Sequence, residues 1–249
     1  AVGDFNNPDR IVLGVFSEEA GTRLRTLYKV FARSNKPIVV TTPETAEMIK
    51  YASNAFLATK ITFINEIANL CEQVGASALE VAAAMGKDGR ISPKFLHPGP
   101  GYGGSCFPKD TKALADTGVK YNAPLTVVES VIAANQRQKQ LAARKVTSRF
   151  PQGGTIAVLG LSFKPETDDI RESPAVEMVQ VMLETGGFTL RLYDPKAMDN
   201  AKAVLGADRP GLVWCASTAE AVQGADAAVI ATEWSEFSTL DFDRLKAEM

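Results

Sequence analysis

Residues 155–160 read TIAVLG, an apolar run that follows a break in the helical pattern at Pro-Gln-Gly-Gly (151–154). Three further apolar runs follow, at 188–193, 212–215 and 226–231, and the segments between the runs have helical spacing at about 174–185, 197–205 and 218–223. Continuous apolar strands that alternate with helices are typical of a parallel sheet covered on both faces. The sequence therefore predicts a Rossmann-like parallel α/β sheet domain over residues 151–249.

The carboxyl ends of these strands are where a ligand is expected, because open parallel sheets bind ligands beyond that edge. These ends are Phe163-Lys164, Tyr193-Asp194 and Thr232-Glu233. Gly160 is followed by Leu-Ser-Phe, so the first strand does not lead into the G-x-G-x-x-G fingerprint of dinucleotide-binding domains. A lysine at position 164 suits a phosphate group, although a surface lysine without a ligand is an equally good interpretation.

The region before this domain has the pattern of helices. Thr42 is expected to cap a long helix with Pro43 at its first position, and Gly75 closes it. Its apolar residues recur every seven positions, at Ile49, Phe56, Phe63 and Leu70. Such a rod needs apolar partners on more than one side. Further helices are expected at 77–85, 109–116 and 124–149, which gives a helical middle domain over 43–150 that forms a homodimer.

Residues 1–42 hold a β-α-β pattern, with strands at 11–15 and 37–41 around a helix at 18–31. Two strands are too few to form a stable sheet alone. The sequence starts without Met and stops at Met249 within an apparent helix, so we expect it to be a fragment of a longer protein.

The composition excludes several classes of protein. A net charge of −2 with 45% hydrophobic residues is typical of a globular chain and offers no basic field for nucleic acid. No apolar stretch approaches 18 residues and no signal peptide is evident, which predicts a cytoplasmic protein without a membrane segment. Three cysteines and a single histidine (His97) do not suffice for a disulfide framework or a multi-histidine metal site, so no metal is expected.

Cys106 stands in the most distinctive stretch, GPGYGGSCFPKD at positions 99–110. Glycines allow the backbone to approach a ligand closely, and Pro108 marks the start of a helix directly after the cysteine. The positive end of a helix, with Lys109 beside it, favours the nucleophilic thiolate. A lone cysteine is more often a small buried apolar residue, and that interpretation is preferred for Cys71 and Cys215. The glycine-rich setting reverses the preference for Cys106.

Three segments resemble the UDP-glucose/GDP-mannose dehydrogenase family of nucleotide-sugar 6-dehydrogenases: GYGGSCFPKD (101–110), KYASNAF (50–56) and GLSFKPETDDIRESP (160–174). They occur in the family's order, and the resemblance spans essentially the whole chain. Family members add an amino-terminal Rossmann domain that carries the dinucleotide fingerprint and a catalytic glutamate, and residues 1–42 resemble the tail of that domain. The resemblance therefore implies that this chain alone is inactive.

The resemblance implies an NAD-dependent, four-electron oxidation of a sugar C6 alcohol to a carboxylate, in which Cys106 forms first a thiohemiacetal and then a thioester. Lys50 and Asn54 are four residues apart on one helix face, where they could hold an alkoxide or oxyanion. Without the resemblance, a solvated helix surface would be preferred for this pair. Asp110 matches the family's catalytic aspartate, which is proposed to position the lysine or a water. Its alternative is a carboxylate that stabilises a helix start.

The resemblance also assigns binding residues. The substrate-binding set comprises Arg90, which reaches in from the partner subunit, Phe95, Leu96, His97, Gly99, Tyr102, Gly103, Phe163 and Lys164. His97 stands where some members have lysine, so an ordinary polar contact is expected of it. Arg171 matches an arginine that contacts NAD, and its alternative role is an ion pair with Asp168 or Glu172.

The segment KFLHPGPGY (94–102) looks more like the UDP-glucose branch of the family than the GDP-mannose branch. This implies oxidation of UDP-glucose to UDP-glucuronate, with GDP-mannose and UDP-N-acetylmannosamine as alternative substrates. A second hypothesis is a non-catalytic, nucleotide-sugar-binding dimer module. A thiol redox switch at Cys106 is disfavoured because no second cysteine lies near it in the sequence.

Overall fold

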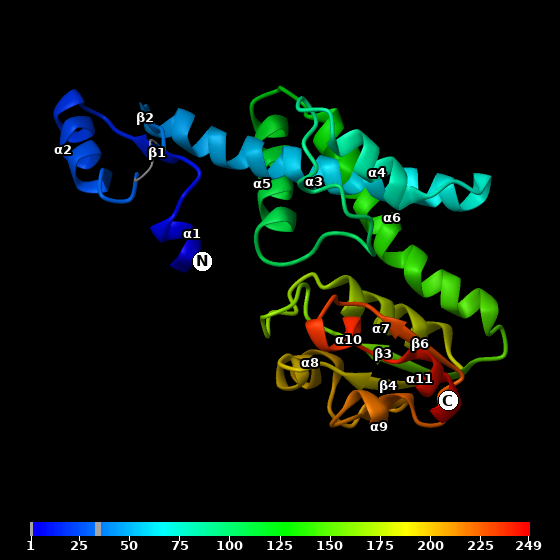
Figure 1. Ribbon diagram of the computed structural model, residues 1–249. Helices are drawn as coiled ribbons and strands as arrows, with labels where there is room; N and C mark the ends of the chain where they lie inside the picture. Colours follow the sequence, from blue (N-terminus) through cyan, green and yellow to red (C-terminus); the bar gives the residue numbers. More distant parts are fainter. Residues whose placement is uncertain (1, 33–35) are drawn as a thin grey trace. The chain divides into compact units, whose positions relative to one another are not determined.

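The computed structural model describes residues 2–32 and 36–249 and divides into two units, one reaching to Phe56 and one spanning Leu57–Met249 (Figure 1). The long helix α3 (Pro43–Val74) contributes residues to both units. Each unit is described separately below.

The first unit contains the β-α-β element that the sequence predicts. Strands β1 (Ile11–Gly14) and β2 (Ile38–Thr41) pair in parallel around α2 (Glu18–Tyr28), with the short helix α1 (Val2–Asn6) before them. Helix α2 ends three residues earlier than predicted, because the chain turns there and the Phe31 backbone N–H donates to the Tyr28 carbonyl at 3.0 Å. The Phe31 ring then packs edge-on against Phe5, with 5.0 Å between centroids.

Helix α3 confirms the predicted long rod. The Thr45 backbone N–H donates to the Thr42 hydroxyl at 3.3 Å, which satisfies one of the free N–H groups at the helix start. After Val74 the chain leaves the helix through Gly75, whose φ of +73° lies in the left-handed region that glycine adopts without strain. Among the described residues, no helix is both long and apolar enough to cross a membrane.

Three helices follow α3 in the second unit: α4 (Ala78–Gly86), α5 (Phe107–Lys120) and α6 (Thr126–Arg149). Small apolar clusters join them to α3. One contains Ile64, Ala82 and Leu96, and another contains Ala58, Tyr102 and Val131. The long loop between α4 and α5 is thereby tied to the helices at its middle, through Leu96, and near its end, through Tyr102.

A four-stranded sheet forms the carboxyl-terminal part of the second unit and confirms the predicted parallel α/β domain (Figure 1). Its strands are β3 (Gly154–Leu159), β4 (Phe188–Tyr193), β5 (Leu212–Trp214) and β6 (Ala227–Ile230), in the spatial order β5-β4-β3-β6. The helices are α7 (Pro174–Thr185), α8 (Met198–Leu205), α9 (Thr218–Val222), α10 (Ser235–Ser238) and α11 (Phe242–Glu248).

The central strand β3 explains why the sheet needs cover on both faces. Ile156 and Val158 join a cluster with residues of α7 and α8, whereas Ala157 and Leu159 join a separate cluster with α9 and α10. Successive side chains of a strand point to opposite faces, so a continuous apolar run is buried only between two layers. This is the physical basis of the fold prediction made from residues 155–160.

Candidate active site

Cys106 occupies the N-cap position of α5, as the sequence predicts, and its side chain is exposed. Cys71 and Cys215 are buried, which confirms the prediction made for these two thiols. The Cys106 sulfur lies 3.8 Å from the Ser105 hydroxyl, and because the side chain is exposed the thiol is accessible to a ligand that enters from solvent. The positive end of a 14-residue helix lies directly behind it.

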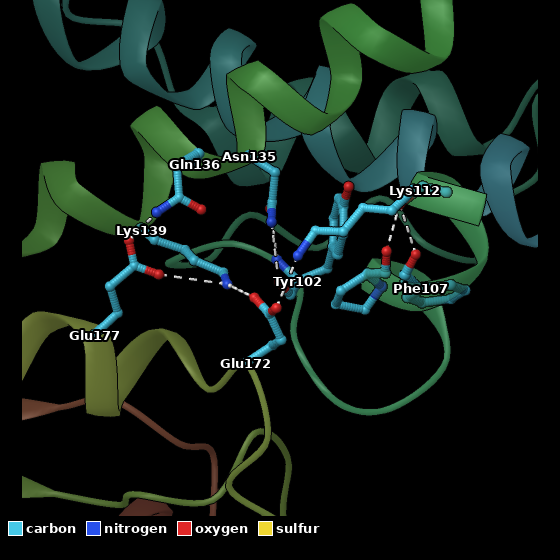
Figure 2. A network of polar contacts seen from close by, with 10 residues as sticks. Tyr102, Phe107, Lys112, Asn135, Gln136, Lys139, Glu172 and Glu177 are labelled. Atoms are coloured by element: carbon cyan, nitrogen blue, oxygen red, sulfur yellow. Dashed lines mark hydrogen bonds and ion pairs between the residues drawn. The ribbon is translucent and has the colours of Figure 1, made fainter. Parts of the chain in front are cut away.

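The loop that precedes Cys106 is fastened to helix α6. The buried Asn135 accepts a hydrogen bond from the Tyr102 backbone N–H at 2.8 Å and donates one to the Tyr102 carbonyl at 3.0 Å (Figure 2). Gln138 donates to the Gly99 carbonyl at 2.8 Å. One amide side chain thus pairs with both backbone groups of a loop residue, which fixes the path of the loop.

The same loop is fastened on its other side to the sheet domain. The Gly104 backbone N–H donates to the Arg171 carbonyl at 2.8 Å. A Cβ atom on Gly103 would lie 2.3 Å from the Glu172 carbonyl oxygen, and one on Gly104 would lie 2.6 Å from the Phe163 ring. These glycines do permit a close approach, as predicted, but the approach is to the protein's own backbone and to an aromatic ring.

A network of charges surrounds this junction (Figure 2). The Lys139 ammonium, on α6, lies 3.0 Å from one oxygen of Glu172 and 3.4 Å from Glu177. Lys112, on α5, holds the other oxygen of Glu172 at 2.8 Å, and Gln136 donates to Glu177. The hydrogen bond from Lys112 and then that from Lys139 lower the pKa of Glu172 against the opposing effect of burial.

A pocket of about 380 Å³ lies at the carboxyl ends of β3 and β6. Helix α3 and the loop before Cys106 supply one part of its lining, and the segments after β3 and β6 supply the other. The lining residues are Ile61, Asn65, His97, Pro98, Gly99, Pro100, Gly101, Ser162, Phe163, Lys164, Pro174, Ile230, Ala231, Thr232 and Glu233. The pocket therefore contains four residues of the predicted substrate-binding set and two of the three predicted strand ends.

The third strand end has an internal role. One carboxylate oxygen of the buried Asp194 accepts hydrogen bonds from the backbone N–H groups of Leu161 and Ser162, and the other accepts from Lys196 and Ala197. Burial alone would raise the pKa of Asp194, but these four donors outweigh it and the pKa is lowered. Asp194 thus shapes the turn after β3 that carries Phe163 and Lys164.

The other five predicted substrate residues lie outside the pocket lining: Arg90, Phe95, Leu96, Tyr102 and Gly103. Leu96 and Tyr102 have buried side chains in the two clusters beneath the loop, and burial is the main cause that raises the pKa of Tyr102. Phe95 packs edge-on against Phe107, with 6.1 Å between ring centroids. The side chains of Leu96 and Tyr102 stabilise the loop, and any contact of theirs with a ligand stays a prediction.

The two predicted arginines form similar local pairs. Arg90 binds Asp88 at 2.6 Å, and Arg171 binds Asp169 at 2.6 Å. Each aspartate holds its arginine's pKa above the ordinary value, and for Arg171 the nearby Cys106 charge adds a smaller contribution in the same direction. The predicted alternative partners of Arg171, Asp168 and Glu172, were wrong. Asp169 takes the arginine because the turn also brings the Arg171 backbone N–H to the same carboxylate, at 3.0 Å.

The remaining catalytic candidates divide between the units. Lys50 and Asn54 belong to the first unit, on the part of α3 before Leu57, where Lys50 is exposed and Asn54 is buried. The burial of Asn54 argues against a purely solvated helix surface for this pair. Asp110 belongs to the second unit and is buried, with one carboxylate oxygen 2.6 Å from the Lys109 ammonium.

Two polar residues in or beside the pocket were not predicted from the sequence. Asn65 lies one turn after Ile61 on the buried side of α3, and Lys139 lies on α6 with a side chain that is 2% exposed. A polar residue on the buried side of an amphipathic helix is the signal that could have found Asn65. Lys139 has no such signal, because lysines of amphipathic helices are usually exposed.

The helical domain and the sheet domain each match a domain of a known family. Residues 44–137 match the central domain of the UDP-glucose/GDP-mannose dehydrogenase family, and residues 157–249 match the UDP binding domain of the same family. The chain belongs to the UDP-glucose/GDP-mannose dehydrogenase family.

Relatives with close sequence similarity include UDP-glucose 6-dehydrogenases. That of Rhizobium meliloti (strain 1021) is 50% identical over 254 residues, and that of Pseudomonas aeruginosa is 41% identical over 258 residues; each comparison includes all of this chain. The chain covers 57% and 56% of these two proteins, so it spans little more than half of their length.

A solved structure of a UDP-glucose dehydrogenase from Pyrobaculum islandicum superposes with a TM-score of 0.90 at 37% identity, over 97% of this chain and 55% of that one. The structure of a UDP-D-ManNAc dehydrogenase from Pyrococcus horikoshii superposes with a TM-score of 0.82 at 28% identity, over 100% of this chain and 55% of that one. Both similarities support the fold described above.

Proposed function

We propose that the complete protein oxidises the C6 alcohol of UDP-glucose to the carboxylate of UDP-glucuronate, with Cys106 as the covalent nucleophile. The observation that carries this proposal is the position of Cys106. It is an exposed thiol at a helix start, on a loop whose earlier residues, 97–101, line the pocket at the strand ends. The similarity of UDP-glucose 6-dehydrogenases over the whole chain supports the choice of substrate.

The proposed reaction removes four electrons in two steps. NAD, bound to the complete protein, would accept the two hydrides. After the first oxidation, the Cys106 sulfur adds to the carbonyl carbon of the C6 aldehyde and the oxygen takes up a proton, which gives a thiohemiacetal. Loss of a second hydride and a proton from this adduct gives a thioester. Water then adds to the thioester carbon, the carbon–sulfur bond breaks, and the carboxylate and the free thiol are released.

This order of steps explains why a covalent bond to Cys106 is useful. A free aldehyde could leave the site between the two oxidations, whereas a thiohemiacetal stays attached until the second hydride has left. In the proposal, Lys50 and Asn54 stabilise negative charge on the C6 oxygen, and Asp110 positions a lysine or a water. The burial of Asp110 beside Lys109, with an interatomic distance of 2.6 Å, supports a positioning role over a direct role in proton transfer.

We assign parts of the substrate to residues that line the pocket. Lys164 is exposed, with its ammonium 5.4 Å from the centre of the Phe163 ring, and it forms no ion pair within the described part of the chain, so it is available to a phosphate. We assign the diphosphate to Lys164 and part of the nucleotide to Phe163, His97 and Gly99. Arg171 is the candidate contact for NAD, because its guanidinium is exposed and its backbone carbonyl accepts from Gly104, two residues before Cys106.

We also propose a homodimer through the helical domain, with Arg90 reaching the partner's pocket. Phe63 and Leu70 on α3 are 47% and 58% exposed, and Val127 on α6 is 65% exposed. A groove of about 330 Å³ between α3 and α6 has Phe63 and Val127 in its lining. Apolar side chains in such numbers are usually covered by a partner, and a twofold axis would let one helix pair cover the other.

A substrate panel tests the proposed function. The complete protein is assayed with NAD and, separately, UDP-glucose, GDP-mannose and UDP-N-acetylmannosamine, and values of kcat/KM are compared. The proposal predicts the highest value for UDP-glucose and two NADH formed for each UDP-glucuronate. A preference for either other sugar nucleotide would overturn the substrate assignment. Binding of UDP-glucose without any oxidation would instead favour the non-catalytic dimer module.

A further inference from the structure

The side chain of Asn65 is buried in the lining of the pocket and is only half satisfied. It is 1% exposed, and its oxygen accepts a hydrogen bond from the Gly99 backbone N–H at 2.8 Å. Its Nδ2 group, also shielded from solvent, has no hydrogen-bond partner among the residues that the structure describes. A buried amide donor without an acceptor costs free energy, so such groups are rarely left unpaired in a working protein.

The orientation of this amide is fixed by its surroundings. Because the Gly99 N–H can only donate, the Asn65 oxygen must face it, and the NH₂ group must point elsewhere. Helix α3 holds the residue one turn after Ile61, and both residues belong to the lining of the pocket. A donor that is fixed in this way and has no acceptor among the described residues is available to an acceptor on a bound ligand.

The lining near Asn65 indicates what kind of acceptor fits. Ile61 and the run Pro98–Gly101 contribute apolar side chains and backbone, whereas the positive charge of the pocket is on Lys164, after β3. A phosphate is better served by the ammonium of Lys164 than by one neutral amide. A neutral carbonyl oxygen on a flat ring suits an amide donor between apolar walls.

We propose that Asn65 recognises the substrate by donating a hydrogen bond from Nδ2 to a carbonyl oxygen of its pyrimidine base. This inference rests on the proposed function, since it takes the pocket to be the site of a nucleotide sugar. Asn65 is then a specificity-determining residue. It also couples the base to the catalytic loop, because the same amide holds Gly99, seven residues before Cys106.

An Asn65→Asp variant separates recognition from loop anchoring. The aspartate keeps an oxygen for the Gly99 N–H but replaces the donor with a second acceptor. Binding of UDP to the complete protein, measured by calorimetry, should weaken roughly 10- to 100-fold, since two acceptors would then face each other. Asn122→Asp is the matched control, because it adds the same charge at an exposed turn and should bind UDP like the unchanged protein.

A second measurement leaves the protein unchanged. Sulfur is a weaker acceptor than oxygen, so either 2-thio-UDP or 4-thio-UDP should bind at least several-fold more weakly than UDP, and the affected analogue identifies the oxygen. If Asn65→Asp does not fold, these analogues still test whether a carbonyl oxygen of the base accepts a hydrogen bond. Unchanged affinity of both analogues, or of a folded Asn65→Asp protein for UDP, would overturn the inference alone. Failure of the unchanged protein to bind UDP at all would overturn the proposed function together with it.

Discussion

The Lys139 ammonium lies 3.0 Å from a carboxylate oxygen of Glu172, and the two side chains differ greatly in burial, at 2% and 41% exposed. The pair joins helix α6 to the sheet domain next to the loop that leads to Cys106 (Figure 2). An ion pair between a buried and a half-exposed group is asymmetric, because the buried group has no water to replace a lost partner, whereas the half-exposed group can be hydrated.

This asymmetry predicts unequal costs for two substitutions. Glu172→Gln leaves the buried Lys139 ammonium with Glu177, at 3.4 Å, as its one carboxylate partner among the described residues. It should destabilise the protein by about 1–3 kcal/mol, less than a fully buried pair would lose. Lys139→Met leaves Glu172 still paired with Lys112 and near water, so it should cost less. Urea unfolding of both variants checks this order. Glu166→Gln, which breaks the exposed pair with Lys196, is the control expected to cost under about 1 kcal/mol. A larger loss for Lys139→Met than for Glu172→Gln would contradict the asymmetry.

Gly103→Ala should impair both stability and activity. Its Cβ would lie 2.3 Å from the Glu172 carbonyl oxygen, a distance that forces the loop before Cys106 or the Glu172 backbone to move. We expect a loss of about 1–3 kcal/mol in the free energy of unfolding and at least a tenfold fall in kcat of the complete protein. Gly89→Ala, whose Cβ meets nothing within 4 Å, serves as the stability control. Wild-type kcat in Gly103→Ala would show that the loop does not need this close approach.

Asp194 predicts a specific acid sensitivity. Its folded-state pKa is lowered, so its carboxylate contributes stability that is fully present above its ordinary pKa of about 3.9 and is lost as pH falls through the lowered value. Asp194→Asn should cost about 2–4 kcal/mol near pH 7, because a charged acceptor of four backbone hydrogen bonds is replaced. Unfolding measured between pH 2 and 7 should therefore show a smaller difference between the two proteins at the acid end. If the difference in the free energy of unfolding between the two proteins grew as pH fell, the prediction would be wrong.

The exposed apolar surface of the helical domain predicts self-association of this chain. Sedimentation at micromolar concentration should give about twice the monomer mass of 26.7 kDa. Substituting aspartate for Phe63, which is half-exposed in the groove between α3 and α6, should shift the chain toward monomer. A monomer at this concentration would remove the proposed contacts from residues 43–150.

Much of this fold follows from local sequence patterns. The apolar run at 155–160 is buried on both faces because residues 156 and 158 and residues 157 and 159 meet different helix layers, and this pattern can be read without a structure. The start of α3 at Thr42 and the position of Cys106 at the start of α5 were likewise predictable from capping residues and proline.

The site was less predictable where it depends on contacts between distant segments. Nothing in the sequence near Lys139 indicates that its charge is buried, because its partners are 33 and 38 positions away. The choice of Asp169 over Asp168 or Glu172 for Arg171 depends on the shape of one turn. The glycines at 103 and 104 were associated with a ligand, whereas their nearest neighbours are Glu172 and Phe163.

Product analysis of a Cys106→Ala variant tests the proposed covalent role most directly. The complete protein is incubated with UDP-glucose and NAD, and UDP-glucuronate is quantified beside the unchanged protein and a Cys71→Ala control, in which a buried thiol is removed. We predict UDP-glucuronate from the unchanged protein and the control, and a loss of at least about a thousandfold in Cys106→Ala. Formation of UDP-glucuronate by Cys106→Ala at the unchanged rate would contradict a covalent role for this thiol.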